Sequence, residues 1–149
     1  MVLAEEKQAI VFLRDEISEL ILLVATEKGA FLYYSDSDRR HWDVNGPHFL
    51  GSVVHHLVLD SRDNKTLLAS VQSRQSGVTI YWSKDFGKTW SPATKPPVFP
   101  QDKLKRKVDH IYYLTPGHDR EGKAWYAGTS PQGLFRSEDG GDTWDSVEG

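Results

Sequence analysis

Short stretches of apolar and aromatic residues recur along the chain and are separated by polar turns such as 61–64 and 117–122. The stretches are rich in β-branched and aromatic residues, and turn-forming residues bound them, so they predict strands. They fall into three rows that repeat in the same order. The first row is 9–13, 53–59 and 108–114, the second is 19–26, 65–71 and 123–129, and the third is 29–34, 77–82 and 133–136.

The start of the chain has a competing interpretation. Glu, Lys, Gln and Ala favour helix, so an amphipathic helix over 4–17 is the alternative to a strand over 9–13. Alignment of 9–13 with the other two strands of its row is the better explanation.

Two eight-residue segments share the pattern S-x-D-x-G-x-T-W, and we call this segment the box. A degenerate copy keeps Ser35 and Trp42 but has Ser37, Arg39 and His41 at the Asp, Gly and Thr positions, with Asp36 and Asp38 as alternative sources of the acid. The serines that open the three boxes are 48 and 54 residues apart, near the period of a four-stranded propeller blade. The residues that match the pattern are Ser83, Asp85, Gly87, Thr89 and Trp90 in one box, and Ser137, Asp139, Gly141, Thr143 and Trp144 in the other.

Each unit therefore consists of three strands, a box and a short fourth strand. Three units fill residues 1–149, with approximate divisions at 1–43, 44–91 and 92–149. The sequence predicts one all-β domain, a partial β-propeller of three four-stranded blades.

The box is predicted to be structural. Its Asp and Ser can accept hydrogen bonds from the turn, its Gly can take a positive φ, and its Trp can anchor the turn against the sheet. We expect Trp42, Trp90 and Trp144 all to do so. Catalytic or calcium-binding roles for Asp85 and Asp139 are less favoured, because a single active site needs each acid only once.

The boxes resemble those of BNR, or Asp-box, repeat proteins, which include sialidases, xyloglucan-degrading enzymes, sortilin-type receptors and photosystem II assembly factors. Segments 24–31, 42–49 and 133–141 resemble more closely the N-terminal part of bacterial sialidase-like or glycosyl-hydrolase-like proteins. The resemblance implies a β-propeller, with six or seven blades in the relatives and with the box away from the ligand face. It also implies a carbohydrate-directed function, with a non-catalytic interaction or assembly scaffold as the alternative.

Ligands of propellers bind where loops converge around the channel, which predicts His48, Arg74 and Arg106 as candidate ligand-binding residues. The basic run around Arg106 has a solvated face as its alternative. His56 and His110 are predicted to occupy the same place in two first-row strands, as metal ligands or a general base or as hydrogen-bonded structural groups.

The sequence assigns no catalytic residue. The three arginines, the tyrosine and glutamate pair and the acidic donor that a sialidase needs cannot be placed. No H-x-E or H-E-x-x-H spacing supports a metal, and no cofactor is expected.

The composition of the chain restricts the classes of partner that we expect it to bind. A net charge of -3 disfavours nucleic acid and anionic membranes, and the absence of cysteine excludes disulfides and thiolate chemistry. The longest apolar run, 20–25, is too short to span a membrane, so we expect a soluble, cytoplasmic protein. Three blades cannot close a ring. We therefore expect exposed apolar faces on the end blades, covered by self-association or by further blades, and a carbohydrate or protein as ligand.

Overall fold

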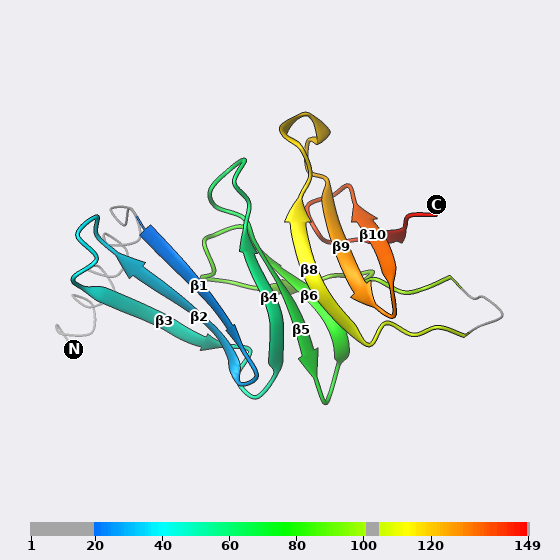
Figure 1. Cartoon of the computed structure of the whole chain (residues 1–149), viewed down its shortest axis with the longest axis horizontal. Coiled ribbons are helices and arrows are strands. Elements are labelled where there is room, and N and C mark those ends of the chain that lie inside the picture. Colours follow the sequence, from blue (N-terminus) through cyan, green and yellow to red (C-terminus); the bar gives the residue numbers. More distant parts are fainter. Residues whose placement is uncertain (1–19, 101–104, 149) are drawn as a thin grey trace.

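The computed structural model describes residues 20–100 and 105–148, which form three antiparallel sheets without an α-helix in these ranges (Figure 1). The sheets lie one after another along the molecule, each formed by consecutive segments of the chain. This is the arrangement of β-propeller blades, so the sheets are called the first, second and third blade. The all-β propeller prediction is confirmed.

The described strands of the first blade are β1 (Leu20–Thr26), β2 (Gly29–Ser35) and β3 (Trp42–His48). The strand predicted at 9–13 and its helical alternative at 4–17 lie outside the described residues.

The second and third blades have four strands each, in chain order from one edge to the other. The second contains β4 (Val53–Leu59), β5 (Leu67–Ser73), β6 (Gly77–Ser83) and β7 (Ser91–Pro92). The third contains β8 (His110–Pro116), β9 (Trp125–Ser130), β10 (Gly133–Ser137) and β11 (Asp145–Ser146), with a short 3-10 helix, η1 (Asp119–Glu121), between β8 and β9.

Strands β5, β8 and β9 begin two residues later than the sequence predicted, and β5 and β8 also end two residues later. The predicted blade divisions after residues 43 and 91 fall within β3 and β7. In the described ranges no helix has the length and apolar character needed to cross a membrane.

Two apolar cores lie between the blades. Leu32 of the first blade packs with Leu67 and Ala69 of the second, and all three are fully buried. Leu68 and Ile80, also from the second blade, belong to the core shared with the third. Neighbouring residues of β5 thus face opposite blades, as the two-residue period of a strand requires, and its first five residues, 67–71, are buried on both faces.

The connections gather at the two ends of the blades. The β4–β5 and β8–β9 connections lie at one end, and the tight β1–β2, β5–β6 and β9–β10 turns lie at the other (Figure 1). We call these the box end and the hairpin end, because the boxes follow β2, β6 and β10 on the side of the β4–β5 connection.

The outer face of the third blade exposes both apolar and charged side chains, among them Leu134 and Val147, which are 46% and 43% exposed. Leu134 corresponds in register to the fully buried Ile80. Arg136 stands where the second blade has Trp82, and its guanidinium lies 3.0 Å from Glu138 Oε1. This face therefore combines an internally paired charge with half-exposed apolar side chains, and what covers it stays a prediction.

Candidate functional site

The two complete boxes form the same hydrogen-bonded turn. In the second blade, Ser83 Oγ donates to Asp85 Oδ1 at 2.7 Å and accepts from the Gly87 amide at 2.8 Å. The Thr89 amide and hydroxyl both donate to the Asp85 carboxylate, at 2.8 and 2.5 Å. The Asp and Ser side chains are thus used within the turn, which supports the structural interpretation of the box.

The third blade repeats these bonds. Asp139 accepts from Ser137 Oγ at 2.8 Å and from the Thr143 amide at 2.9 Å, and the Gly141 amide donates to Ser137 Oγ at 3.0 Å. Partial desolvation opposes ionisation of Asp139, but the hydrogen bonds from Thr143 and Ser137 outweigh it and lower the pKa of the carboxyl below its ordinary value. The ionised carboxylate is therefore the form that the turn binds.

The degenerate first box does not anchor its tryptophan. Trp144 is 1% exposed, whereas Trp42 is 41% exposed and its indole N–H donates only to the nearby carbonyl of Arg39, at 3.2 Å. The prediction that all three tryptophans lock their turns is wrong for Trp42. Trp144 packs in the core shared with the preceding blade, whereas the described residues place no blade on that side of the first, and Ser37 supplies no carboxylate to the turn.

The inner strands β4 and β8 lie side by side, and each contains a bulge at the same place. The register is interrupted at His55 in β4 and at Tyr112 in β8. Because both residues of such a bulge face a single partner residue, neighbouring side chains emerge close together. His55 and His56 therefore stand beside Tyr112 and Tyr113 of the next blade.

This register corrects the predicted equivalence of two histidines. Counting from the bulges, His56 corresponds to Tyr113, while His110 corresponds to Val53. The structure still brings His56 and His110 to the same pair of strands, but through different contacts.

Aromatic stacking holds these side chains together. The ring of His110 stacks on Tyr112 with centroids 5.2 Å apart and planes 8° apart, and that of His56 stacks on Tyr113 at 5.0 Å and 21°. His55 meets His110 edge to face at 4.7 Å. We call these five residues the inner-strand surface.

Polar contacts orient the imidazoles. His55 Nε2 lies 2.9 Å from Gln72 Oε1, and His110 Nδ1 lies 2.7 Å from Asp109 Oδ2. His56 Nδ1 accepts the Leu114 amide at 3.0 Å, and burial lowers the pKa of this histidine. His56 is therefore a neutral ring at pH 7 that carries its proton on Nε2.

The other predicted ligand residues lie elsewhere. His48 packs against Trp90 with ring centroids 5.8 Å apart, and burial lowers its pKa. Arg74 is exposed in the β5–β6 turn, and the Arg106 guanidinium lies 4.4 Å from the centre of the Phe99 ring. A ligand role for these three residues stays a prediction.

The sequence analysis missed His55, Tyr112 and Tyr113. The paired aromatic dipeptides 55–56 and 112–113, each followed by leucine, were the available signal. The described residues contain no group of three or more His, Cys, Asp or Glu side chains arranged to hold a metal ion.

No protein-family model and no curated protein matches the chain. Among solved structures, the fold is similar to that of a GH74 xyloglucanase from Xanthomonas campestris, with a TM-score of 0.57 and 18% identity over 78% of this chain and 19% of that one. It is also similar to YCF48 bound to D1 peptide, with a TM-score of 0.52 and 13% identity over 87% of this chain and 38% of that one. The chain thus spans about a fifth and two fifths of these β-propellers, and the similarity shows the fold alone.

Proposed function

We propose that the chain is a BNR/Asp-box repeat protein of the propeller type that binds carbohydrate without hydrolysing it, and that the inner-strand surface is the binding site. The observation that carries the proposal is the exposure of two stacked tyrosines on an inner strand. Tyr112 and Tyr113 are 55% and 59% exposed although each is backed by an imidazole ring.

The chemistry of the surface matches a sugar. An exposed aromatic face packs against the apolar C–H face of a pyranose, while a few fixed polar groups select hydroxyl positions. The imidazoles of His55 and His110 and the amide of Gln72 supply such groups beside the tyrosines. The similarity of the fold to that of a xyloglucanase supports this ligand class.

Binding rather than hydrolysis follows from the acids around the surface. Glycosidases place two carboxyl groups about 5 to 9.5 Å apart across the scissile bond. In the described part of the chain, the carboxylate that contacts this surface is Asp109, and it is paired with His110. One engaged carboxylate provides neither the acid and base pair nor an acid and nucleophile.

A protein ligand is the second candidate. The structure of YCF48, which covers most of this chain, is a complex with a peptide. Exposed tyrosines are also favoured at protein interfaces, where they bury a large area at a small entropic cost.

A glycan array, followed by calorimetry with the best oligosaccharide, tests the proposal. We expect Tyr113→Ala and Tyr112→Ala each to weaken binding by about tenfold, equivalent to about 1.4 kcal/mol. Tyr33→Ala, an aromatic truncation on β2 of the first blade, is the matched control and should change affinity by less than about twofold.

A panel of aryl glycosides, assayed alongside the array, detects hydrolysis. Turnover by the wild-type chain would contradict the non-catalytic proposal. Binding to a peptide library but to no glycan, with the same dependence on Tyr112 and Tyr113, would replace the carbohydrate by a protein ligand.

A further inference from the structure

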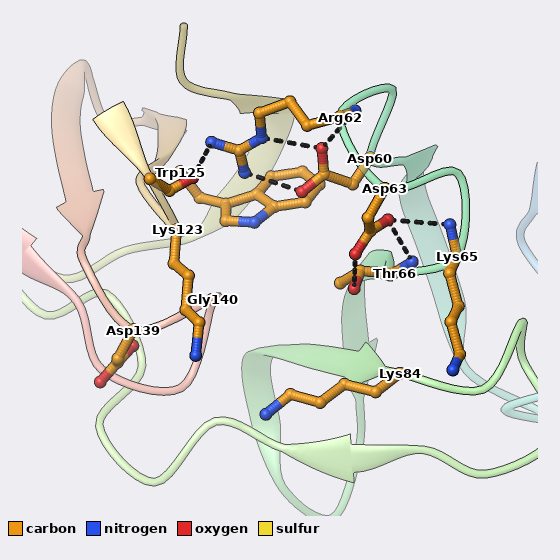
Figure 2. A pocket seen from close by; sticks show the side chains of 11 residues that line it. Asp60, Arg62, Asp63, Lys65, Thr66, Lys84, Lys123, Trp125, Asp139 and Gly140 are labelled. Atoms are coloured by element: carbon orange, nitrogen blue, oxygen red, sulfur yellow. Dashed lines mark hydrogen bonds and ion pairs between the residues drawn. The ribbon is translucent and has the colours of Figure 1, made fainter. Parts of the chain in front are cut away.

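A pocket of about 400 Å³ opens between the second and third blades at the box end, away from the tight hairpin turns (Figure 2). Its walls come from the β4–β5 turn, the η1–β9 turn and the boxes of both blades. The lining residues are Asp60, Arg62, Asp63, Lys65, Thr66, Lys84, Gly122, Lys123, Trp125, Asp139 and Gly140.

The arginine of the pocket is already neutralised. Arg62 Nε and Nη2 donate to the two oxygens of Asp60 at 2.8 and 2.7 Å, and Nη1 donates to the carbonyl of Gly122 at 2.7 Å. The guanidinium also lies 5.7 Å from the ring centre of Trp125. Hydrogen bonding to Asp60 raises the pKa of Arg62, and the bond from Arg62 to the Gly122 carbonyl links the β4–β5 turn to the third blade.

The two remaining carboxylates are also engaged within the protein. Asp63 accepts the amides of Lys65 and Thr66, both at 2.8 Å, and the Thr66 hydroxyl at 2.6 Å. Despite partial desolvation, these bonds lower the pKa of Asp63. Asp139 is held by its own box, as described above. Neither carboxylate pairs with a lysine ammonium in the described residues.

Three ammonium groups therefore remain available to a ligand, and they outnumber the two carboxylates, which keep their negative charge because their partners are neutral amides and hydroxyls. Lys84 of the second blade and Lys123 of the third reach toward the space between the blades, and Lys65 lies on the same side as Lys84 (Figure 2). Lys84 Nζ is 4.5 Å from the ring centre of Trp82, a contact that holds the charge near the mouth of the pocket. In the described ranges no ion pair neutralises any of the three.

We propose that this pocket binds a small polyanion that carries two or more phosphate groups. Ammonium groups from three separate segments surround a space large enough for a compact molecule, and lysine binds phosphate as a compact point charge. A ligand with several anionic groups can engage more than one lysine at once, whereas a single monoanion cannot. The pocket lies at the opposite end of the blades from the hairpin turns, and the proposal does not depend on carbohydrate binding.

Calorimetric titration with inorganic tripolyphosphate at low ionic strength tests the site. The double substitution Lys84→Gln and Lys123→Gln should weaken binding by at least about tenfold, because it removes two of the three free charges. The wild-type affinity should also fall as sodium chloride is raised, as screening requires.

A charge-matched control separates the pocket from general electrostatics. Lys28→Gln with Lys107→Gln removes the same net charge from exposed positions on the β1–β2 turn and ahead of β8, and should change affinity by less than about twofold. Melting curves establish whether both double variants are folded. If the pocket double variant is unfolded, the single variant Lys65→Gln replaces it, with an expected loss of affinity of about threefold.

Three results would overturn the proposal. They are the absence of wild-type binding at low salt, equal losses in the pocket and control variants, and a loss confined to the control. The last result would indicate that the anion binds at the basic segment around Arg106 and not in the pocket. Titration with orthophosphate should give binding at least about tenfold weaker than tripolyphosphate, and equal affinities would contradict recognition of several phosphates.

Discussion

The first and third boxes occupy the same place in their blades but end in different tryptophan environments. In the third, Asp139 accepts hydrogen bonds from the amides of Asp142 and Thr143. Trp144 is buried, and its indole N–H donates to the carbonyl of Gly141 at 2.9 Å. In the first, the box serine only donates to a nearby carbonyl, and Trp42 remains exposed. The anchored turn therefore differs from the loose one in two ways, by the carboxylate of Asp139 and by the preceding blade on which Trp144 packs.

The glycine of the box explains how the anchored turn joins neighbouring blades. A Cβ atom on Gly141 would lie 2.8 Å from Leu68 of the preceding blade, and one on Gly87 would lie 2.5 Å from Leu32. Both glycines also have positive φ, at 100° and 82°. The box thus brings its backbone against the previous blade, a contact that a side chain at this position would prevent.

The largest expected difference between the two boxes is in their tryptophans. Trp144→Ala should lower the free energy of unfolding by about 3 to 5 kcal/mol, because it empties a buried site in the core between blades. Trp42→Ala should cost less than about 1 kcal/mol, since much of that side chain is already in water. Urea unfolding of both variants measures the two values, and similar losses would contradict the proposed difference in anchoring.

A smaller effect is expected from the acid of the box. Asp139→Ala should destabilise the chain by about 1 to 2 kcal/mol, because it leaves turn amides without their acceptor, although their access to water limits the loss. Ser37→Ala at the matching position of the first box should have almost no effect. Urea unfolding at pH 7 provides the comparison, and equal losses would show that the carboxylate does not organise the turn.

The same carboxylates give this comparison a pH dependence. The pKa values of Asp85 and Asp139 are lowered in the folded chain, so the folded state favours ionisation. Their contribution is complete above the ordinary carboxyl pKa of 3.8 and is lost as pH falls toward and through the lower folded values. Asp139→Ala should therefore cost less stability near pH 3 than at pH 7, and a constant cost would contradict this linkage.

The fold was predictable because its signals are local. The box turn is specified by residues within eight positions of one another, and the strands by runs of β-branched and aromatic residues bounded by turn residues. Exposure of Trp42 was missed because the tryptophan itself is retained while its partner acid is not. The prediction treated the residue type as sufficient, whereas burial depends on the turn geometry that precedes it.

The candidate sites were less predictable because they depend on register between blades. The bulges at His55 and Tyr112 occupy matching places, so His56 corresponds to Tyr113 and not to His110, as comparison of single histidines had predicted. The pocket at the box end joins Lys65, Lys84 and Lys123 from three separate turns. Their proximity follows from how two blades pack, which no spacing within one repeat encodes.

The smallest expected effect concerns the glycine position of the first box. Arg39 occupies it with φ of 56°, in the left-handed region that non-glycine residues adopt at a cost. Arg39→Gly should remove this strain and raise the free energy of unfolding by up to about 1 kcal/mol, because the greater freedom of glycine in the unfolded chain offsets part of the gain. Gly141→Ala is the opposite test, since its φ of 100° and the nearby Leu68 should make any Cβ destabilising. Thermal melts that show a gain for Arg39→Gly and a loss for Gly141→Ala would establish that both turns need the same backbone conformation. A loss for Arg39→Gly would mean instead that the arginine side chain stabilises the first turn by contacts of its own, so that the two boxes differ in mechanism as well as in strength.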